Sequence, residues 1–221
     1  MATTATKTVR DMVTRALRLA RVTAVDEDPT AADADQAMDM LNSMIKGWQN
    51  EGHSLWYRSS MTLAMDGDPA TSYTLPPARP LEIHSARWKG TATGSEIPML
   101  PLTRDEYDEL PNKSTTGTPT QYHYDRQREN ALFYIWPILS AASATASILI
   151  TYTREAEDIT SLSDVLEMPG EWWETTAYAL ASRLNDIYGQ AVPSVIQRAE
   201  ILEDKAFAFD REGSVFFGIG S

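Results

Sequence analysis

The chain has 221 residues, contains no cysteine and carries a formal net charge of −12 at pH 7. The lack of cysteine excludes disulfide scaffolds, thiolate metal sites and cysteine nucleophiles. The acidity argues against a general nucleic-acid binder, which needs a basic face to neutralise phosphates. No run of 18 apolar residues and no apolar signal-peptide core occurs, so we expect neither a membrane span nor a secretory leader.

The N-terminal segment has the pattern of an amphipathic helix. Thr6 or Thr8 can cap this helix, and its apolar stripe comprises Val9, Met12, Val13, Ala16, Leu17 and Ala20. Arg10, Arg15 and Arg18 fall on the other face. A solvated face is the simpler interpretation of these arginines, and an acidic protein partner that docks there is the alternative.

A second helix is expected from Thr30, its cap, to Gly52, which gives a helical hairpin with the first. Asp33, Asp35 and Asp39 suggest calcium at first sight. An EF-hand loop, however, requires a glycine at its sixth position and a glutamate at its twelfth, and both are missing here. Acids at a helix N-terminus are the simpler interpretation.

From His53 the hydrophobic period changes from 3.6 to 2, which indicates strands. Met61, Leu63 and Met65 alternate up to a turn signal at 66–69, so we expect a hairpin with a returning strand at 73–75. Another strand is expected at 81–88. Pro98 and Pro101 bracket an edge or extended segment.

The remaining part of this region predicts a short helix and further strands. Thr103 and Glu106 form a capping-box pattern that opens a helix to Leu110. Residues 120–124 and 132–136 predict a second hairpin, and residues 147–153 predict a last strand.

An apolar helix after residue 168 organises the chain. Pro169 fits its first turn and Gly189 its left-handed cap. The expected core face comprises Trp173, Thr176, Ala177, Leu180, Ala181, Leu184, Ile187 and Tyr188. A helix this apolar must be buried against other helices, so the N-terminal helices and a last helix from Pro193 should join it.

These elements predict an α+β fold in which an α-helical bundle from both chain ends carries an inserted small antiparallel β domain. The helical domain comprises residues 1–52 and 155–212, and the β-rich domain comprises residues 53–154. Residues 213–221 form an apolar, glycine-broken tail with Val215, Phe216, Phe217 and Ile219. We expect this tail to dock on another subunit or partner, with disorder as the alternative.

A search for catalytic or metal-binding patterns gives little. His53, His84 and His123 stand alone, without metal-ligand spacing, and no nucleophile elbow, phosphate loop or zincin pattern occurs. Glu171 and Glu174 beside two tryptophans could form a glycosidase site, but acids in the first turn of a helix need no catalysis to explain them. We therefore predict no enzyme and no catalytic, cofactor-binding or metal-binding residue.

Several weak motifs, in a fixed order, resemble the head-to-tail adaptor family of tailed bacteriophages, the tail accessory factors best known from short-tailed phages. They occur at residues 37–48, 73–76, 79–83, 117–122, 132–137, 168–173 and 177–181. The order and spacing of these motifs carry the resemblance, which covers most of residues 8–209.

The resemblance implies a structural virion protein of the phage neck, made in the host cytoplasm. A homo-oligomeric ring of twelve copies would lie below the portal protein, extend the DNA channel and help to retain packaged DNA. Double-stranded DNA would pass through its lumen without sequence-specific binding, and a downstream tail or nozzle protein would dock below. The tail residues Val215, Phe216, Phe217 and Ile219 would dock on the portal, and the candidates for the subunit interface are Arg10, Arg15, Arg18 and Trp172.

Three other functions remain open at this point. A tail-tube or collar component lower in the tail could share the architecture, and an enzyme that degrades cell-wall glycans would use acids such as Glu171 and Glu174. A free-standing carbohydrate- or protein-binding module would expose Trp56, Trp88 and Trp136 on one sheet face.

Overall fold

The computed structural model describes residues 7–53, 57–65, 70–75, 80–90, 95–127, 131–139 and 146–209. Within those residues it has five helices and one curled seven-stranded sheet, so the prediction of a mixed α+β protein is confirmed. The chain divides into two compact units. The helical unit comprises residues 1–56 and 156–221, and the β unit comprises residues 57–155.

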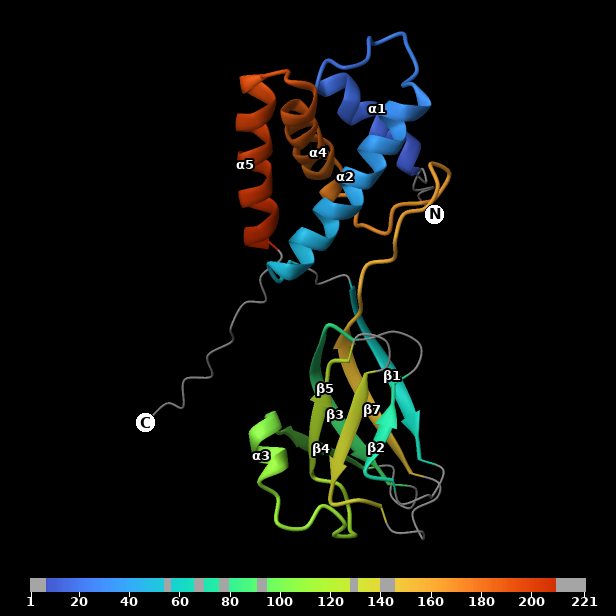
Figure 1. Ribbon diagram of the computed structural model, residues 1–221, viewed down its shortest axis with the longest axis vertical. Helices are drawn as coiled ribbons and strands as arrows, with labels where there is room; N and C mark the ends of the chain where they lie inside the picture. The colour runs from blue at the N-terminus through green and yellow to red at the C-terminus, as the bar shows by residue number, and fades with distance from the viewer. Residues whose placement is uncertain are drawn as a thin grey trace, which may run out of the picture. The chain divides into compact units, whose positions relative to one another are not determined.

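In the helical unit, α4 is the central helix and packs against the other three (Figure 1). The four helices are α1 (Val9–Leu19), α2 (Ala31–Asn50), α4 (Trp172–Tyr188) and α5 (Pro193–Phe209). Small residues on several sides of α4 let the neighbouring backbones approach closely. Its buried residues are Trp172, Thr175, Thr176, Ala177, Ala179, Leu180, Ala181, Leu184 and Asn185.

Local capping chemistry fixes the helix ends. The Thr8 hydroxyl accepts the Asp11 N–H at 3.4 Å, and the Asp11 carboxylate accepts the Thr8 N–H at 2.9 Å, which is a reciprocal capping box. The Thr30 hydroxyl caps α2 by accepting the Asp33 N–H at 3.2 Å. Gly189 closes α4 with a left-handed φ of 63°, as predicted.

The prediction that Pro169 lies inside α4 is wrong, because the helix begins at Trp172. Pro169 and Gly170 form a preceding turn, since glycine after proline is a poor helix former. The Pro169 carbonyl accepts the Trp172 N–H at 3.1 Å. At the other end Ile187, predicted on the core face, is 44% exposed. It lies in the last turn, where neighbouring positions of the helix are exposed as well.

An aromatic cluster joins α2, α4 and α5. The ring centroids of Trp48 and Trp172 are 5.5 Å apart, and Phe207 lies 6.0 and 5.9 Å from them. Both tryptophans are buried, and the Trp48 indole N–H donates to the Glu203 carboxylate at 3.1 Å. Aromatic pairs of this geometry contribute about 0.5–1.5 kcal/mol beyond their buried area.

The segment that follows the β unit, residues 156–168, is here called the return segment. Its carbonyls at Leu162 and Asp164 accept the N–H groups of Arg10 and Val9, both at 2.9 Å. These N–H groups lie in the first turn of α1, where intrahelical acceptors are missing. The return segment therefore completes the hydrogen bonding of the first helix.

The β unit is one sheet with the strand order β1-β7-β3-β4-β5-β6-β2. All neighbours are antiparallel except β4 and β5, and α3 (Arg104–Asp108) lies between those two in the chain. The strands are β1 (Arg58–Ala64), β2 (Ser72–Thr74), β3 (Glu82–Lys89), β4 (Glu96–Pro101), β5 (Gln121–Asp125), β6 (Leu132–Trp136) and β7 (Ser147–Thr153).

Strand pairing confirms one predicted hairpin and contradicts the other. β5 and β6 pair as expected. β1 and β2 do not pair: β1 lies beside β7, and β2 beside β6, at opposite ends of the sheet order. The seven-residue β1 forms a full ladder with β7, which the three-residue β2 could not match. β4 is extended as predicted but lies between two strands, so the edge assignment is wrong.

One face of the sheet forms the core of the β unit. Phe133, Ile148 and Ile150 are fully buried there, and Trp88 is 5% exposed. Residues from strands at both ends of the sheet order share this core, which the curl of the sheet explains.

Candidate interaction surface

The outer side of α1 carries the arginines that the sequence singles out. Because the apolar stripe of α1 is buried, Arg10, Thr14, Arg15 and Arg18 lie on the opposite side of the helix; we call these four residues the arginine face. Arg10 and Arg15 are exposed and Arg18 is half-buried.

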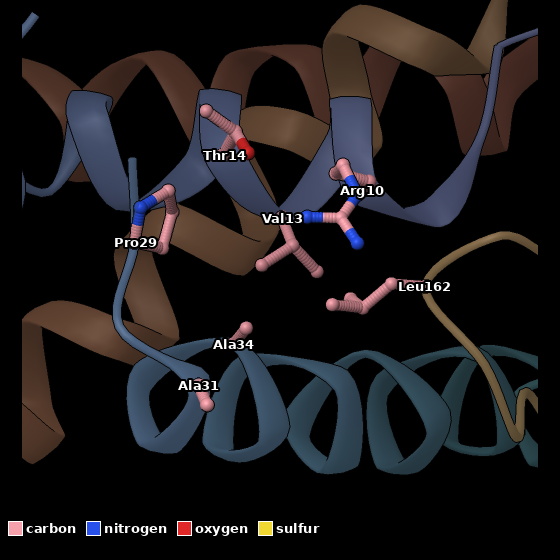
Figure 2. Close-up of a pocket in the computed structure, with 7 residues that line it drawn as sticks. All are labelled: Arg10, Val13, Thr14, Pro29, Ala31, Ala34 and Leu162. Atoms are coloured by element: carbon pink, nitrogen blue, oxygen red, sulfur yellow. The ribbon is translucent and has the colours of Figure 1, made fainter. Parts of the chain in front are cut away.

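The arginine face borders two hollows. A pocket of about 240 Å³ lies between α1 and α2, and Figure 2 shows Val13 and Leu162 reaching into it, with Arg10 at one side. A broader hollow of about 570 Å³ lies along the arginine face itself. Its lining includes the apolar side chains of Leu19 and Val25, and Val25 is 76% exposed. The surface thus combines apolar side chains with surrounding charge, which is typical of interfaces.

The arginines of this face form no direct ion pair within the described residues, although Asp11 and Asp28 line the same hollow. Among the residues that the structure describes, neither Arg10 nor Arg15 has an ion pair or a side-chain hydrogen bond. Arg18 donates to the Glu27 carbonyl at 3.2 Å, which leaves its charge uncompensated by a carboxylate. The nearby Asp11 carboxylate accepts the Thr8 N–H, and this hydrogen bond is the main reason that the pKa of Asp11 is lowered, with smaller contributions from the charges of Lys7 and Arg10.

The other predicted interface residue, Trp172, has a different environment. Its side chain is 3% exposed and belongs to the aromatic cluster with Trp48 and Phe207. The structure thus places Trp172 in the core of the helical unit, away from the arginine face. Val215, Phe216, Phe217 and Ile219 lie outside the described residues.

A comparison with protein families identifies the family to which the chain belongs. The model of the family described as SU10 adaptor protein matches residues 7–211, which is most of the chain. The chain belongs to the SU10 adaptor protein family. A comparison with curated proteins found no match.

As a member of the SU10 adaptor family, the chain is a bacteriophage adaptor of the virion neck, a structural class. The resemblance to phage head-to-tail adaptors that the sequence motifs indicate is thereby confirmed. Over the described ranges, no helix of this adaptor is long and apolar enough to cross a membrane.

Of the residues considered for catalysis, Glu174, His84 and His123 have structural partners in the adaptor, and Glu171 makes no side-chain capping hydrogen bond to any described residue. Glu174 accepts from the Arg198 guanidinium at 3.1 Å, and Glu171 stands at the N-cap of α4. His84 lies 2.6 Å from the Thr153 hydroxyl, and His123 lies 3.0 Å from the Leu102 carbonyl. No group of three or more metal-ligating side chains occurs within the described part of the chain.

A binding module would need a row of exposed tryptophans on the sheet. Trp88 cannot belong to such a row, because it is buried in the β unit. Trp136 is half-buried and donates its indole N–H to the Asn112 carbonyl at 3.0 Å. Trp56 lies outside the described residues.

The apolar component of the arginine face could not be recognised from the sequence pattern. Val25 precedes three acids, Asp26, Glu27 and Asp28, and belongs to no periodic apolar pattern that would single it out. The same holds for Leu100, which is 64% exposed on β4 of the β unit. Strand alternation alone does not tell which face of a strand meets solvent.

Proposed function

We propose that this adaptor forms a ring of twelve copies below the portal, extends the DNA channel and provides the platform for the next tail protein. The observation that carries the proposal is the family match over residues 7–211. The helical unit, an α-helical bundle from both chain ends, would form the wall of the ring, and the β unit would contact the downstream tail or nozzle protein.

The charge distribution supports this role. A chain of net charge −12 has little attraction for phosphates, so double-stranded DNA can slide through its lumen. The arginine face is the exception, and uncompensated arginines beside apolar side chains suit contact with a protein surface. Arg10, Arg15 and Arg18 are therefore proposed subunit-interface residues, with Trp172 supporting the helices from inside.

The C-terminal residues 213–221 are the proposed portal-docking segment. Their apolar side chains, Val215, Phe216, Phe217 and Ile219, would lower solubility if they stayed in water, and binding to the portal would bury them.

Deletion of residues 213–221 tests this proposal. The shortened protein should remain a folded monomer and should lose binding to purified portal rings of the same phage, as seen by co-sedimentation. F216A/F217A should weaken binding in the same direction, whereas a conservative change outside the segment, Ser43→Ala, should not. Undiminished binding of the shortened protein would refute the docking role. Binding to tail tubes rather than portal rings would favour the tail-tube or collar alternative.

A further inference from the structure

The side of α5 that faces away from α4 carries uncompensated acids. Val195 and Ala199 are buried, which turns the opposite side of the helix to solvent. Glu200 and Asp204 are exposed there, and Ile201 beside them is 40% exposed. We call Glu200, Ile201 and Asp204 the acidic face.

Among the three acids of α5, Glu203 is paired inside the helical unit, and Glu200 and Asp204 are not paired in the described part of the chain. Glu203, on the inner side of α5, accepts from Arg183 at 3.4 Å and from the Trp48 indole at 3.1 Å. Within the described ranges, neither Glu200 nor Asp204 has an ion pair or a side-chain hydrogen bond. The acidic face therefore matches the arginine face in having charge without an internal partner.

The two faces lie on opposite sides of one unit. α4 packs against both α1 and α5, and those two helices flank it within the helical unit (Figure 1). Each face is turned away from α4, because the residues that point toward the core are buried on both helices. Two different surfaces on opposite sides of a subunit are what a head-to-tail contact requires, and such contacts close into rings when the rotation allows.

We propose that the arginine face of one copy binds the acidic face of the next copy. This inference rests on the proposed ring and names its subunit contact. The composition of the faces is complementary: Val25 and Leu19 lie among arginines, and Ile201 lies beside two acids. Apolar contact supplies burial, and the opposed charges fix the register and disfavour wrong pairings.

A phosphate-bearing partner is the less favoured occupant of the arginine face. The hollow along this face also includes Asp11 and Asp28, whose carboxylates would repel phosphate groups. A protein surface can place its acids opposite the arginines and its apolar groups opposite Val25.

Charge reversal on either face tests the contact. R10E/R15E and E200K/D204K should each raise the concentration for half-maximal assembly by about tenfold or more, because like charges then face each other. Assembly is measured by sedimentation of the full chain, alone and on portal rings, after circular dichroism has established that the variants fold. D35K/D39K, on the exposed side of α2, is the matched control for E200K/D204K, and Arg126→Glu in the β unit controls for added negative charge.

Mixing the two variants gives the decisive result. In an equimolar mixture the reversed α1 of one variant meets the reversed α5 of the other, and the two remaining faces are unchanged. The mixture should therefore assemble near the parent concentration, although neither variant does so alone. A mixture no better than its components, or reversals that leave assembly unchanged while the parent forms rings, would overturn this contact.

Cross-linking separates failure of the contact from failure of the ring. Because the chain has no cysteine, R15C/D204C with a short bis-maleimide should give a ladder of oligomers, whereas R15C or D204C alone should not. Oligomers of the parent without this ladder would refute the contact only. A parent that never assembles, even on portal rings, would refute the ring and the contact together. Loss of binding to a DNA duplex in R10E/R15E without any effect on assembly would assign the arginine face to phosphates instead.

Discussion

The side-chain amide of Asn42 binds both backbone groups of Ile159. Its Nδ2 donates to the Ile159 carbonyl at 2.9 Å, and its Oδ1 accepts the Ile159 N–H at 2.9 Å. Next to this pair, Lys46 forms an ion pair with Asp158. A residue of α2 thus holds a residue 117 positions later, which attaches the return segment to the N-terminal helices.

Asn42→Ala should loosen the return segment. Both Ile159 groups lose their partner, and removal of such hydrogen bonds typically costs about 1–3 kcal/mol. Amide hydrogen exchange at Ile159 and a lower urea midpoint of the helical unit report the effect. Ser43→Ala is the control, because the exposed Ser43 hydroxyl only bonds the Asp39 carbonyl of its own helix. Unchanged exchange at Ile159 would show that the amide does not hold the segment.

Leu180→Asp should unfold the helical unit. Leu180 is fully buried in α4, and an unpaired charge there costs several kcal/mol or more. The helical circular dichroism signal should fall at room temperature. Ile187→Asp, in the same helix but at a side chain that is 44% exposed, should retain the parent signal. A normal melting temperature for Leu180→Asp would contradict the central position of α4.

Trp172→Ala should lower the stability of the helical unit, and any loss of assembly should follow from that lower stability. Removal of a buried tryptophan leaves a cavity and typically costs about 3–5 kcal/mol. Trp173 is half-buried, with the Lys7 ammonium 4.8 Å from its ring, so Trp173→Ala should cost clearly less. Equal melting temperatures for Trp172→Ala and the parent, with assembly lost, would instead place Trp172 directly at a subunit contact.

Stability should fall at high pH through Tyr188. Its hydroxyl donates to Asp33 at 2.6 Å, and burial, followed by this hydrogen bond, raises the pKa of Tyr188 to about 12. The folded state therefore keeps a proton that the unfolded chain releases near pH 10. The contribution is complete below about pH 10 and lost as the pH rises through the folded pKa.

Comparison of Tyr188→Phe with the parent measures how much the Tyr188 hydroxyl contributes to the pH dependence of stability. The urea midpoint of the variant should depend less on pH between pH 10 and 12 than that of the parent. Identical slopes for Tyr188→Phe and the parent would show that the Tyr188–Asp33 hydrogen bond does not persist in solution.

Features set by neighbouring residues could be predicted from the sequence. The caps at Thr8, Thr30, Thr103 and Gly189 depend on side chains within three or four positions, and all four occur. The β5–β6 hairpin is equally local.

Features set by distant segments could not be predicted in this way. The turn signal at 66–69 indicates a change of direction, but the partner of β1 is β7, and Arg58 pairs with Thr153, 95 positions later in the chain. For the same reason the sequence indicated the arginines of α1 but not the acids of α5. Glu200 and Asp204 become a candidate surface only once α4 places α5 opposite α1.

The mass of the purified protein, measured alone and mixed with portal rings of the same phage, decides whether the chain forms a ring on the portal. We expect a ring-sized complex with twelve copies per portal ring. A protein that stays monomeric at every concentration and does not bind portal rings would contradict the proposed ring, whatever the outcome of the stability measurements.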